Sequence, residues 1–396
     1  MCIRDSFYNW YDTRTLHTLA PLYVSSVDSG NLAGHLLTHG AGLQELVDER
    51  IFSPQVFAGL RDTIGILRSL GASSPVLAEL DGELTDAPAS LSEAAALLER
   101  VTDHATKVAA ALANETDELK GWARALGQSC QEHRDDLHLM APWLSLPATP
   151  PGLAGLHAGA DGAVSRQARS DQGLPASAAT KLGEKIDWLD KAPTLREIST
   201  LDQSVCPLID EALGDSTLRQ SQPGDGEGAW LAELSRCVRE ASEGARQRML
   251  ALEKLAQQSN EMAEMDFTFL ADPERNLLAV GFNVTDRRRD TSFYDLLASE
   301  SRLGSYVAIA QGQVPQNHWF SLGRLLVPSP RGPILVSWSG SMFEYLMPLL
   351  VMPSYANTLL EHTCRAVVHQ QIEYGRLRGV PWGISESCLL YTSRCV

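Results

Sequence analysis

The stretch AWLAELSRCVREASEGARQRMLALEKLAQQSNEMA, residues 229–263, sets the fold class of this chain. Its apolar residues recur every three or four positions, close to a heptad repeat, at Leu231, Leu234, Val238, Ala241, Ala245, Leu252 and Leu255. This spacing places them on one stripe of a helix, where they can pack against other helices. The stretch therefore predicts one long amphipathic helix in a mainly α fold.

Similar periodicity precedes this stretch and predicts helices over residues 54–70, 90–112 and 117–130. Pro, Gly, Ala and Ser accumulate between residues 146 and 180, which is typical of a linker or a surface loop. We therefore expect residues 71–264 to form a helical bundle, and no catalytic motif is recognisable within it.

The last third of the chain has a different pattern. Runs at residues 277–282 and 333–338 favour short strands, whereas residues 291–310, 342–351 and 357–375 favour helices. Successive helix pairs with only short strands between them are compatible with a ring of paired helices. The loops on one face of such a ring would form a cleft.

Composition excludes several classes of protein. The chain has 396 residues and a formal net charge of −16, so nucleic acid is not expected as the main partner, because phosphate binding needs a basic surface. No run of about 18 apolar residues is present, and no membrane span is expected. The seven Cys are scattered without C-x-x-C spacing, which argues against a zinc site or a disulfide framework. No metal or cofactor is assigned.

Two loops pair a tryptophan with a carboxylate: Trp338 with Glu344 in SWSGSMFEY, and Trp382 with Glu386 in GVPWGISES. Aromatic faces and carboxylates together bind sugars, and carboxyl groups cleave glycosidic bonds as acid, base or nucleophile. The alternative is that these glutamates are solvated or cap helices. Glu344 falls in the first turn of its expected helix, where the helix dipole favours a carboxylate without any catalytic role.

Aromatic residues are also dense near the start of the chain, in FYNWYD at residues 7–12. Such a run packs in a core or lines a cleft, and Trp10, Tyr11 and Asp12 are candidates for the second role. Asp28 precedes an apolar helical series, so it is either a helix N-cap or a further cleft residue.

Both ends of the chain differ in character from the rest. MCIRDS at residues 1–6 and CLLYTSRCV at residues 388–396 resemble translated sequencing-adapter sequence, so we exclude them from the expected fold.

Several long segments resemble the central region of the bacterial cyclic β-1,2-glucan synthases. They are FYNWYDTRTL (7–16), YVSSVDSGNLAGHL (23–36), LAVGFNVT (278–285), YDLLASESR (294–302), and residues 337–352 and 379–387. In that family, a membrane-embedded glycosyltransferase extends the glucan, a phosphorylase region trims it, and a glycoamylase-like region between them closes it into a ring.

The resemblance implies a partial (α/α)6 toroid of the glycoamylase-like kind, with short β-hairpin segments and a helical-bundle insertion. The toroid region would occupy residues 7–70 and 265–387, with the insertion at 71–264. The chain would then be a fragment of a bacterial inner-membrane protein and lie on its cytoplasmic side. Its partners would be β-1,2-glucan and the remainder of the same polypeptide.

Ring closure is an intramolecular transglycosylation, which needs carboxyl groups and the exclusion of water. Glu386 is the first catalytic candidate, as nucleophile or acid/base. Glu344 is the second and is expected to grip sugar hydroxyls rather than transfer protons. Trp10, Tyr11, Asp12, Asp28, Trp338 and Trp382 are expected to bind substrate. The partner carboxyl of Glu386 is expected beyond residue 387.

Two other functions remain open at this stage. A free-standing β-glucan hydrolase of (α/α)6 fold would use the same residues and release linear products. A non-catalytic, helical glucan-binding module would use the aromatic residues alone.

Overall fold

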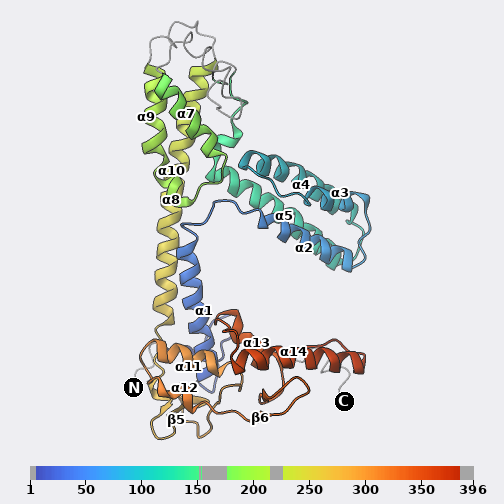
Figure 1. Ribbon diagram of the computed structural model, residues 1–396, viewed down its shortest axis with the longest axis vertical. Helices are drawn as coiled ribbons and strands as arrows, with labels where there is room; N and C mark the ends of the chain where they lie inside the picture. The colour runs from blue at the N-terminus through green and yellow to red at the C-terminus, as the bar shows by residue number, and fades with distance from the viewer. Residues whose placement is uncertain (1–5, 151–152, 154–175, 215–225, 384–396) are drawn as a thin grey trace. The chain divides into compact units, whose positions relative to one another are not determined.

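The computed structural model describes residues 6–150, 153, 176–214 and 226–383 (Figure 1). They fall into two compact units. Unit 1 combines Met1–Leu43 with Lys254–Val396, and unit 2 is Gln44–Glu253. The long helix α10 (Gly226–Ala263) contributes residues to both units. The prediction of a mainly α chain is confirmed.

Unit 2 is built from helices that bury apolar stripes. Its elements besides α10 are α2 (Gln55–Ser69), α3 (Pro75–Glu83), α4 (Leu91–Ala111), α5 (Asp117–Met140), the 3-10 helix η1 (Pro142–Ser145), α7 (Ala176–Leu189), α8 (Leu195–Ser199) and α9 (Leu201–Gly214). Helices α4 and α5 run side by side, α2 packs on α5, and α3 packs on α4 (Figure 1). Their facing sides bury residues such as Leu98, Val101 and Leu126.

Local signals explain where these helices begin. The side chain of Ser90 accepts a hydrogen bond from the Glu93 N–H and caps α4. Thr116 caps α5 through the Leu119 N–H in the same way. Each cap satisfies one of the backbone donors that the first turn leaves without an intrahelical partner.

Unit 1 combines short strands with helices. Its elements are β1 (Tyr23–Ser25), α1 (Ser26–Glu45, of which the residues to Leu43 belong to this unit), η3 (Thr268–Leu270), β2 (Ala271–Asp272), β3 (Leu277–Leu278), β4 (Gly281–Asn283), β5 (Arg288–Arg289), α11 (Ser301–Ala310), α12 (Asn317–Ser321), β6 (Leu326–Val327), β7 (Ile334–Leu335), α13 (Met342–Leu346), η4 (Met347–Leu350) and α14 (Leu359–Arg378).

The strands of unit 1 pair antiparallel. Strands β1, β4 and β5 form one small sheet in that order, with Val24 opposite Phe282. Strands β2 and β3 form a second pair, and β6 and β7 a third. The first sheet joins the N-terminal segment of the chain to its last third, and so it connects the two halves of unit 1.

One predicted helix is wrong over half its length. The segment 291–310 is helical only from Ser301, and the residues before it form an irregular connection. Ser299 has a positive φ of 51°, which an α-helix cannot contain. The hydroxyl of Ser301 also donates to the Asp295 carbonyl oxygen and fixes the turn. The helix-like spacing of apolar residues before Ser301 has another cause. Leu297 is buried although it lies in the irregular connection.

Two helix boundaries also differ from expectation. Helix α5 extends to Met140 rather than Cys130, because a run of polar residues on its solvent side hides the buried stripe that ends in Leu137 and Met140. Helix α1 begins at Ser26, so Asp28 lies inside the first turn and is not the N-cap. Within the described parts of the chain, no helix is both long and apolar enough to cross a membrane.

Candidate functional site

A buried carboxylate, Glu300, lies at the turn that leads into α11. It is only 4% exposed. The amide nitrogen of Asn31 lies 3.4 Å from its Oε1 atom, and the Ser299 hydroxyl donates to its Oε2 atom. Burial raises the pKa of the Glu300 carboxyl, the hydrogen bonds from Ser299 and Asn31 oppose the rise, and the negative charge of Asp28 adds to it. The net result is a pKa of the Glu300 carboxyl above its ordinary value.

Close helix packing brings Glu300 to Asp28 and Asn31. Gly30 of α1 and Gly304 of α11 face each other so closely that a Cβ built on Gly30 would lie 2.2 Å from the Gly304 Cα. No side chain fits in that space. The two backbones therefore approach within a distance that only glycine permits, and the residues just beside this contact become neighbours.

Asp28 is the exposed member of this group. Its Oδ2 atom accepts a hydrogen bond of 2.8 Å from the side-chain amide of Asn9. The same Asn9 side chain accepts one of 3.1 Å from the Ser25 N–H. Asn9 thus ties the aromatic N-terminal segment to the start of α1, next to the two carboxyl groups.

Glu344 occupies a different position, at the start of α13. It forms a capping box with Ser341, and its carboxylate also accepts bonds of 3.0 Å from the Ser339 N–H and 2.8 Å from the Ser339 hydroxyl. Glu344 is 1% exposed. Burial acts to raise the pKa of its carboxyl, but hydrogen bonds from Ser337, Ser339 and Ser299 outweigh burial and hold the pKa below its ordinary value. This carboxylate is therefore held ionised by the protein itself.

Ser299 joins the two buried carboxyl groups. Its hydroxyl donates to Glu300, and its backbone N–H donates to Glu344. Arg302, which is 1% exposed, donates bonds of 2.6 Å to the carbonyl oxygens of Glu344 and Tyr345. These contacts join the connection before α11 to the turn before α13, with a carboxyl of raised pKa and one of lowered pKa on opposite sides of Ser299.

Trp338 offers an exposed indole beside this cluster. It is 54% exposed, although its Nε1 atom donates a 3.0 Å bond to Asp295 Oδ2. Asp295 also forms a 2.5 Å ion pair with Arg324, and the Tyr294 ring lies 5.5 Å from the Trp338 ring between centroids. An indole that is held at its edge while its face stays open suits stacking against a flat ligand.

Trp10 is oriented in a similar way. Its ring stacks on Tyr23, with centroids 5.8 Å apart, and 45% of the residue remains exposed. The Tyr23 hydroxyl donates a 2.5 Å bond to Asp290. Burial raises the pKa of that hydroxyl, and the bond to Asp290 adds to the rise, so Tyr23 stays neutral. Its ring packs against one face of the Trp10 ring.

Two further candidates of the N-terminal segment have local partners. Asp12 accepts bonds from the backbone N–H groups of Thr15 and Arg14, which lower the pKa of its carboxyl. This is the geometry of a turn-forming aspartate. The Tyr11 hydroxyl accepts a 2.9 Å bond from the Tyr8 N–H. Both side chains remain partly accessible, and they also shape the loop that carries Trp10.

Trp382 follows α14, whose C-cap Gly379 has the left-handed backbone that ends many helices. It is 49% exposed and lies against Gly375. Glu386, the first catalytic candidate, lies outside the described residues. The structure thus brings Asp28, Glu344 and the unanticipated Glu300 into one region, with Trp10 and Trp338 exposed around it. Trp382 contacts Gly375 of α14 instead and is not among the residues that these hydrogen bonds join.

The sequence did contain a signal for Glu300. It lies in YDLLASESR, one of the segments that carry the resemblance. Because a continuous helix was expected over residues 291–310, Glu300 was interpreted as an ordinary acidic residue on the surface of that helix. Among the described residues, no three His, Cys, Asp or Glu side chains gather as a metal site requires.

Comparison with known proteins supports the resemblance. No model of a known protein family matches the chain. The chain is 33% identical over 384 residues, 97% of its length, to the protein described as cyclic beta-(1,2)-glucan synthase NdvB of Rhizobium meliloti strain 1021. The chain spans 11% of the length of that curated relative. The resemblance to the cyclic β-1,2-glucan synthases is thereby confirmed.

Proposed function

We propose that the chain is part of a cyclic β-1,2-glucan synthase, and that unit 1 supplies groups that close linear β-1,2-glucan into rings by intramolecular transglycosylation. The similarity to the Rhizobium synthase supports the glucan substrate. The single observation that carries the chemistry is Glu300, a buried carboxyl of raised pKa next to the charge of Asp28.

Glycosidic bonds break when a carboxylic acid protonates the departing oxygen while a second carboxyl group acts on the sugar carbon. A general acid must hold its proton near neutral pH, and desolvation is the usual means of achieving this. Burial and the charge of Asp28 shift the pKa of Glu300 in that direction. In the proposed cycle Glu300, in place of the partner carboxyl expected beyond residue 387, protonates the departing glycosidic oxygen. Glu386 is the carboxylate that attacks the anomeric carbon and forms a glycosyl ester.

Ring closure follows when a hydroxyl at the far end of the same glucan chain attacks this ester. Glu300, now deprotonated, takes the proton of that hydroxyl, the new glycosidic bond forms, and the Glu386 carboxylate leaves. Asp28 lies at the exposed side of Glu300 and is proposed to accept hydrogen bonds from sugar hydroxyls. Trp10, Trp338 and Trp382 are proposed to stack on sugar rings, with Tyr11 and Asp12 shaping the same surface.

Glu344 is proposed to act mainly by positioning. The hydrogen bonds that its carboxylate accepts from Ser339 and Ser341 fix the loop that carries Trp338. Arg302 holds the same segment by donating to the Glu344 carbonyl oxygen. Because Glu344 is 1% exposed and these donors occupy its oxygen atoms, the binding of sugar hydroxyls that the sequence suggested for it is not part of the proposal. The lowered pKa of Glu344 makes it a poor proton donor.

The remainder of the enzyme is proposed from the family resemblance. Unit 1 would form part of an (α/α)6 toroid, and the helical unit 2 would be an insertion in it. The membrane glycosyltransferase and the phosphorylase region would be further parts of the same polypeptide, at the bacterial inner membrane. The segment described here would lie on the cytoplasmic side.

Product analysis tests the proposal. The chain, completed to a whole synthase, is incubated with linear β-1,2-glucan, and the products are weighed by mass spectrometry, since a ring is lighter by one water than the linear chain of equal length. Rings are the expected product. Linear fragments alone would instead identify a hydrolase, and binding without any consumption of glucan would identify a binding module.

The variant Glu300→Gln separates catalysis from binding in this experiment. It is expected to bind glucan and to release at least about a hundredfold fewer rings, the usual contribution of a general acid. Glu274→Gln is the matched control, because Glu274 is an exposed glutamate of the same unit. Equal turnover by Glu300→Gln and the control would refute the assignment.

A further inference from the structure

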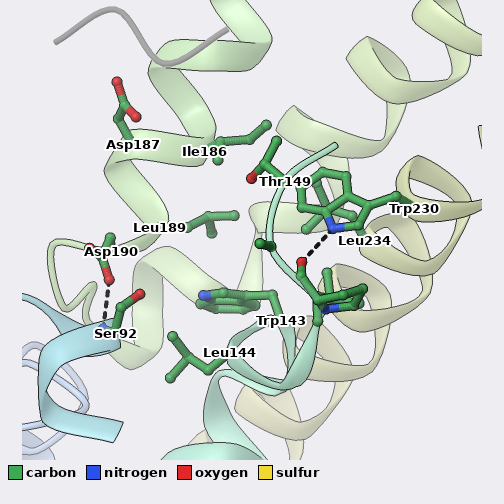
Figure 2. Close-up of a pocket in the computed structure, with 13 residues that line it drawn as sticks. Ser92, Trp143, Leu144, Thr149, Ile186, Asp187, Leu189, Asp190, Trp230 and Leu234 are labelled. Carbon is green, nitrogen blue, oxygen red and sulfur yellow. Dashed lines mark hydrogen bonds between the residues drawn. The ribbon is translucent and has the colours of Figure 1, made fainter. Parts of the chain in front are cut away.

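Unit 2 contains a cavity of about 320 Å³ between η1, α7 and α10 (Figure 2). Its walls include two indoles, Trp143 from η1 and Trp230 from α10, each 8% exposed. Small-molecule sites of roughly 300–1,000 Å³ typically combine aromatic walls with a few placed polar groups. The cavity has that size and make-up, although no catalytic motif was recognised in this part of the chain.

The two indoles differ in how their N–H groups are satisfied. Trp230 donates a 2.9 Å hydrogen bond to the carbonyl oxygen of Pro147, which holds its ring in place. The Trp143 Nε1 atom is buried and has no hydrogen-bond partner among the described residues. A buried donor without a partner is unfavourable, so a ligand acceptor placed against this N–H would be stabilised by it.

Polar side chains lie opposite this unpaired donor. In Figure 2 the nitrogen of Trp143 lies at the end of its ring toward Ser92 and Asp190. The Asp190 carboxylate is held in place by a 2.7 Å bond that its Oδ1 atom accepts from the Ser92 N–H. A carboxylate has about four lone-pair sites, so Asp190 can accept further hydrogen bonds. The cavity thus presents one donor and one fixed acceptor to the same space.

Charge and hydrogen bonding narrow the class of ligand. None of the 13 described residues that line the cavity is Lys, Arg or His, and two are Asp, so a phosphate or carboxylate ligand would be repelled. An ammonium ion would suit Asp190 but offers no acceptor to the Trp143 N–H. A sugar hydroxyl is both donor and acceptor, and the apolar face of a sugar ring suits an indole wall.

We propose that this cavity of unit 2 is a binding site for a neutral sugar, one or two glucose units of a glucan chain. The choice of glucose rests on the proposed function, whereas the preference for a neutral, hydroxyl-rich ligand rests on the cavity alone. The cavity would hold glucan without cleaving it. A variant that loses binding at the cavity can therefore be distinguished from one that loses ring closure at Glu300.

Nuclear magnetic resonance of the full chain, labelled with ¹⁵N-tryptophan, tests the proposal directly. The chain has eight Trp, and the Trp143 indole signal is the one that disappears in Trp143→Phe. The probes are glucose and the β-1,2-linked glucose disaccharide. The disaccharide is expected to shift the Trp143 signal in a saturable way, and Trp143→Phe is expected to bind it about two- to tenfold more weakly through the lost hydrogen bond.

Trp122→Phe is the matched control, since Trp122 is a partly exposed residue of α5 that does not line the cavity. It should bind the disaccharide as the parent does. If Trp143→Phe does not fold, hydrogen–deuterium exchange of the parent protein gives a second readout. The disaccharide should then slow exchange in residues 141–149 and 182–190.

Three outcomes would overturn the proposal. The first is a Trp143 signal, or an exchange pattern, that stays unchanged at tens of millimolar sugar. The second is equal affinity of Trp143→Phe and the parent. The third is a response to choline but not to sugar, which would identify a cation site. Full ring closure by Trp143→Phe together with weakened cavity binding would separate this site from Glu300.

Discussion

Gly30 of α1 and Gly304 of α11 are in backbone contact, because a Cβ on Gly30 would lie 2.2 Å from the Gly304 Cα. This contact sets the spacing between the start of α1 and the start of α11. It therefore determines whether Asn31 and Asp28 can reach Glu300.

Gly30→Ala is expected to destabilise unit 1 by about 1–3 kcal/mol, since overpacking forces the two helices apart. It should also reduce ring closure more than that loss of stability explains, because Glu300 moves away from Asp28. The comparison is Gly42→Ala on the same helix, where a Cβ would meet nothing within 4 Å. That change should be neutral or stabilise by about 0.5–1 kcal/mol. Thermal unfolding of both variants decides the matter, and equal melting temperatures would contradict the close contact.

The pH dependence of stability should reveal the buried Glu300 carboxyl. Because burial raises the pKa of Glu300 in the folded protein, its contribution to stability is complete below the unfolded pKa and is lost as pH rises through the folded pKa. Glu300→Gln, which does not titrate, should therefore gain stability relative to the parent as pH rises from about 4 to 8. Denaturation at several pH values measures the difference, and a difference that does not vary with pH would be inconsistent with a raised pKa.

Asp28→Asn is expected to change the pH profile of activity. Removing the Asp28 charge lowers the pKa of Glu300, so the acid form is lost at lower pH. The alkaline limb of kcat/KM should therefore move toward lower pH. Asp286→Asn, a change at an exposed aspartate of the same unit, should leave the profile in place. An alkaline limb that stays fixed in Asp28→Asn would show that Glu300 does not control it.

The contribution of Glu344 to stability should depend on pH in the opposite direction to that of Glu300. Hydrogen bonds outweigh burial and lower the pKa of its carboxyl, so its contribution to stability is present above the unfolded pKa and is lost as pH falls through the folded pKa. Glu344→Gln should cost about 1–3 kcal/mol at pH 7, through weaker bonds to Ser339 and Ser341. That deficit should shrink as pH falls below about 4. A deficit that is equal at pH 7 and pH 3 would argue that the carboxylate charge is irrelevant.

Trp338 is expected to contribute to glucan affinity without contributing to proton transfer. Covering roughly 50 Å² of its exposed ring would contribute about 1.2 kcal/mol at about 25 cal/mol per Å², so Trp338→Ala should weaken binding of linear β-1,2-glucan about five- to tenfold. Phe320→Ala is the control, since Phe320 is 80% exposed in the same unit and lies on α12. Calorimetric titration of the two variants compares them. An equal loss in both would point to nonspecific surface adhesion.

The sequence predicted those elements whose signal is local. The stripe of α10 and the apolar periodicity of α2 and α4 gave their bounds to within a few residues, because each helix buries one face. The interruption between residues 291 and 300 was missed. The positive φ of Ser299 and its bonds to two carboxyl groups depend on contacts with distant parts of the chain, and local spacing does not encode them.

The same limit applies to the candidate site. Trp338, Trp10 and Asp28 could be selected by residue type, and the structure shows them accessible. Glu300 could not be selected in that way, because its distinguishing property is burial beside Asp28, which follows from the packing of α1 on α11. A structural role for Glu344 at the start of its helix was foreseen as an alternative, because its place in the first turn follows from where the expected helix begins. Whether these residues catalyse ring closure stays a prediction.

Unit 1 is discontinuous in the chain, and its two segments are connected covalently only through the whole of unit 2. A single cleavage anywhere in unit 2 would therefore turn unit 1 into a two-piece assembly. The pairing of β1 with β4 and the glycine contact between α1 and α11 would then be among the noncovalent contacts that hold the pieces together. Co-expressed halves of the polypeptide should accordingly reconstitute unit 1 by complementation, and Gly30→Ala should weaken that reassembly more than it weakens the intact chain.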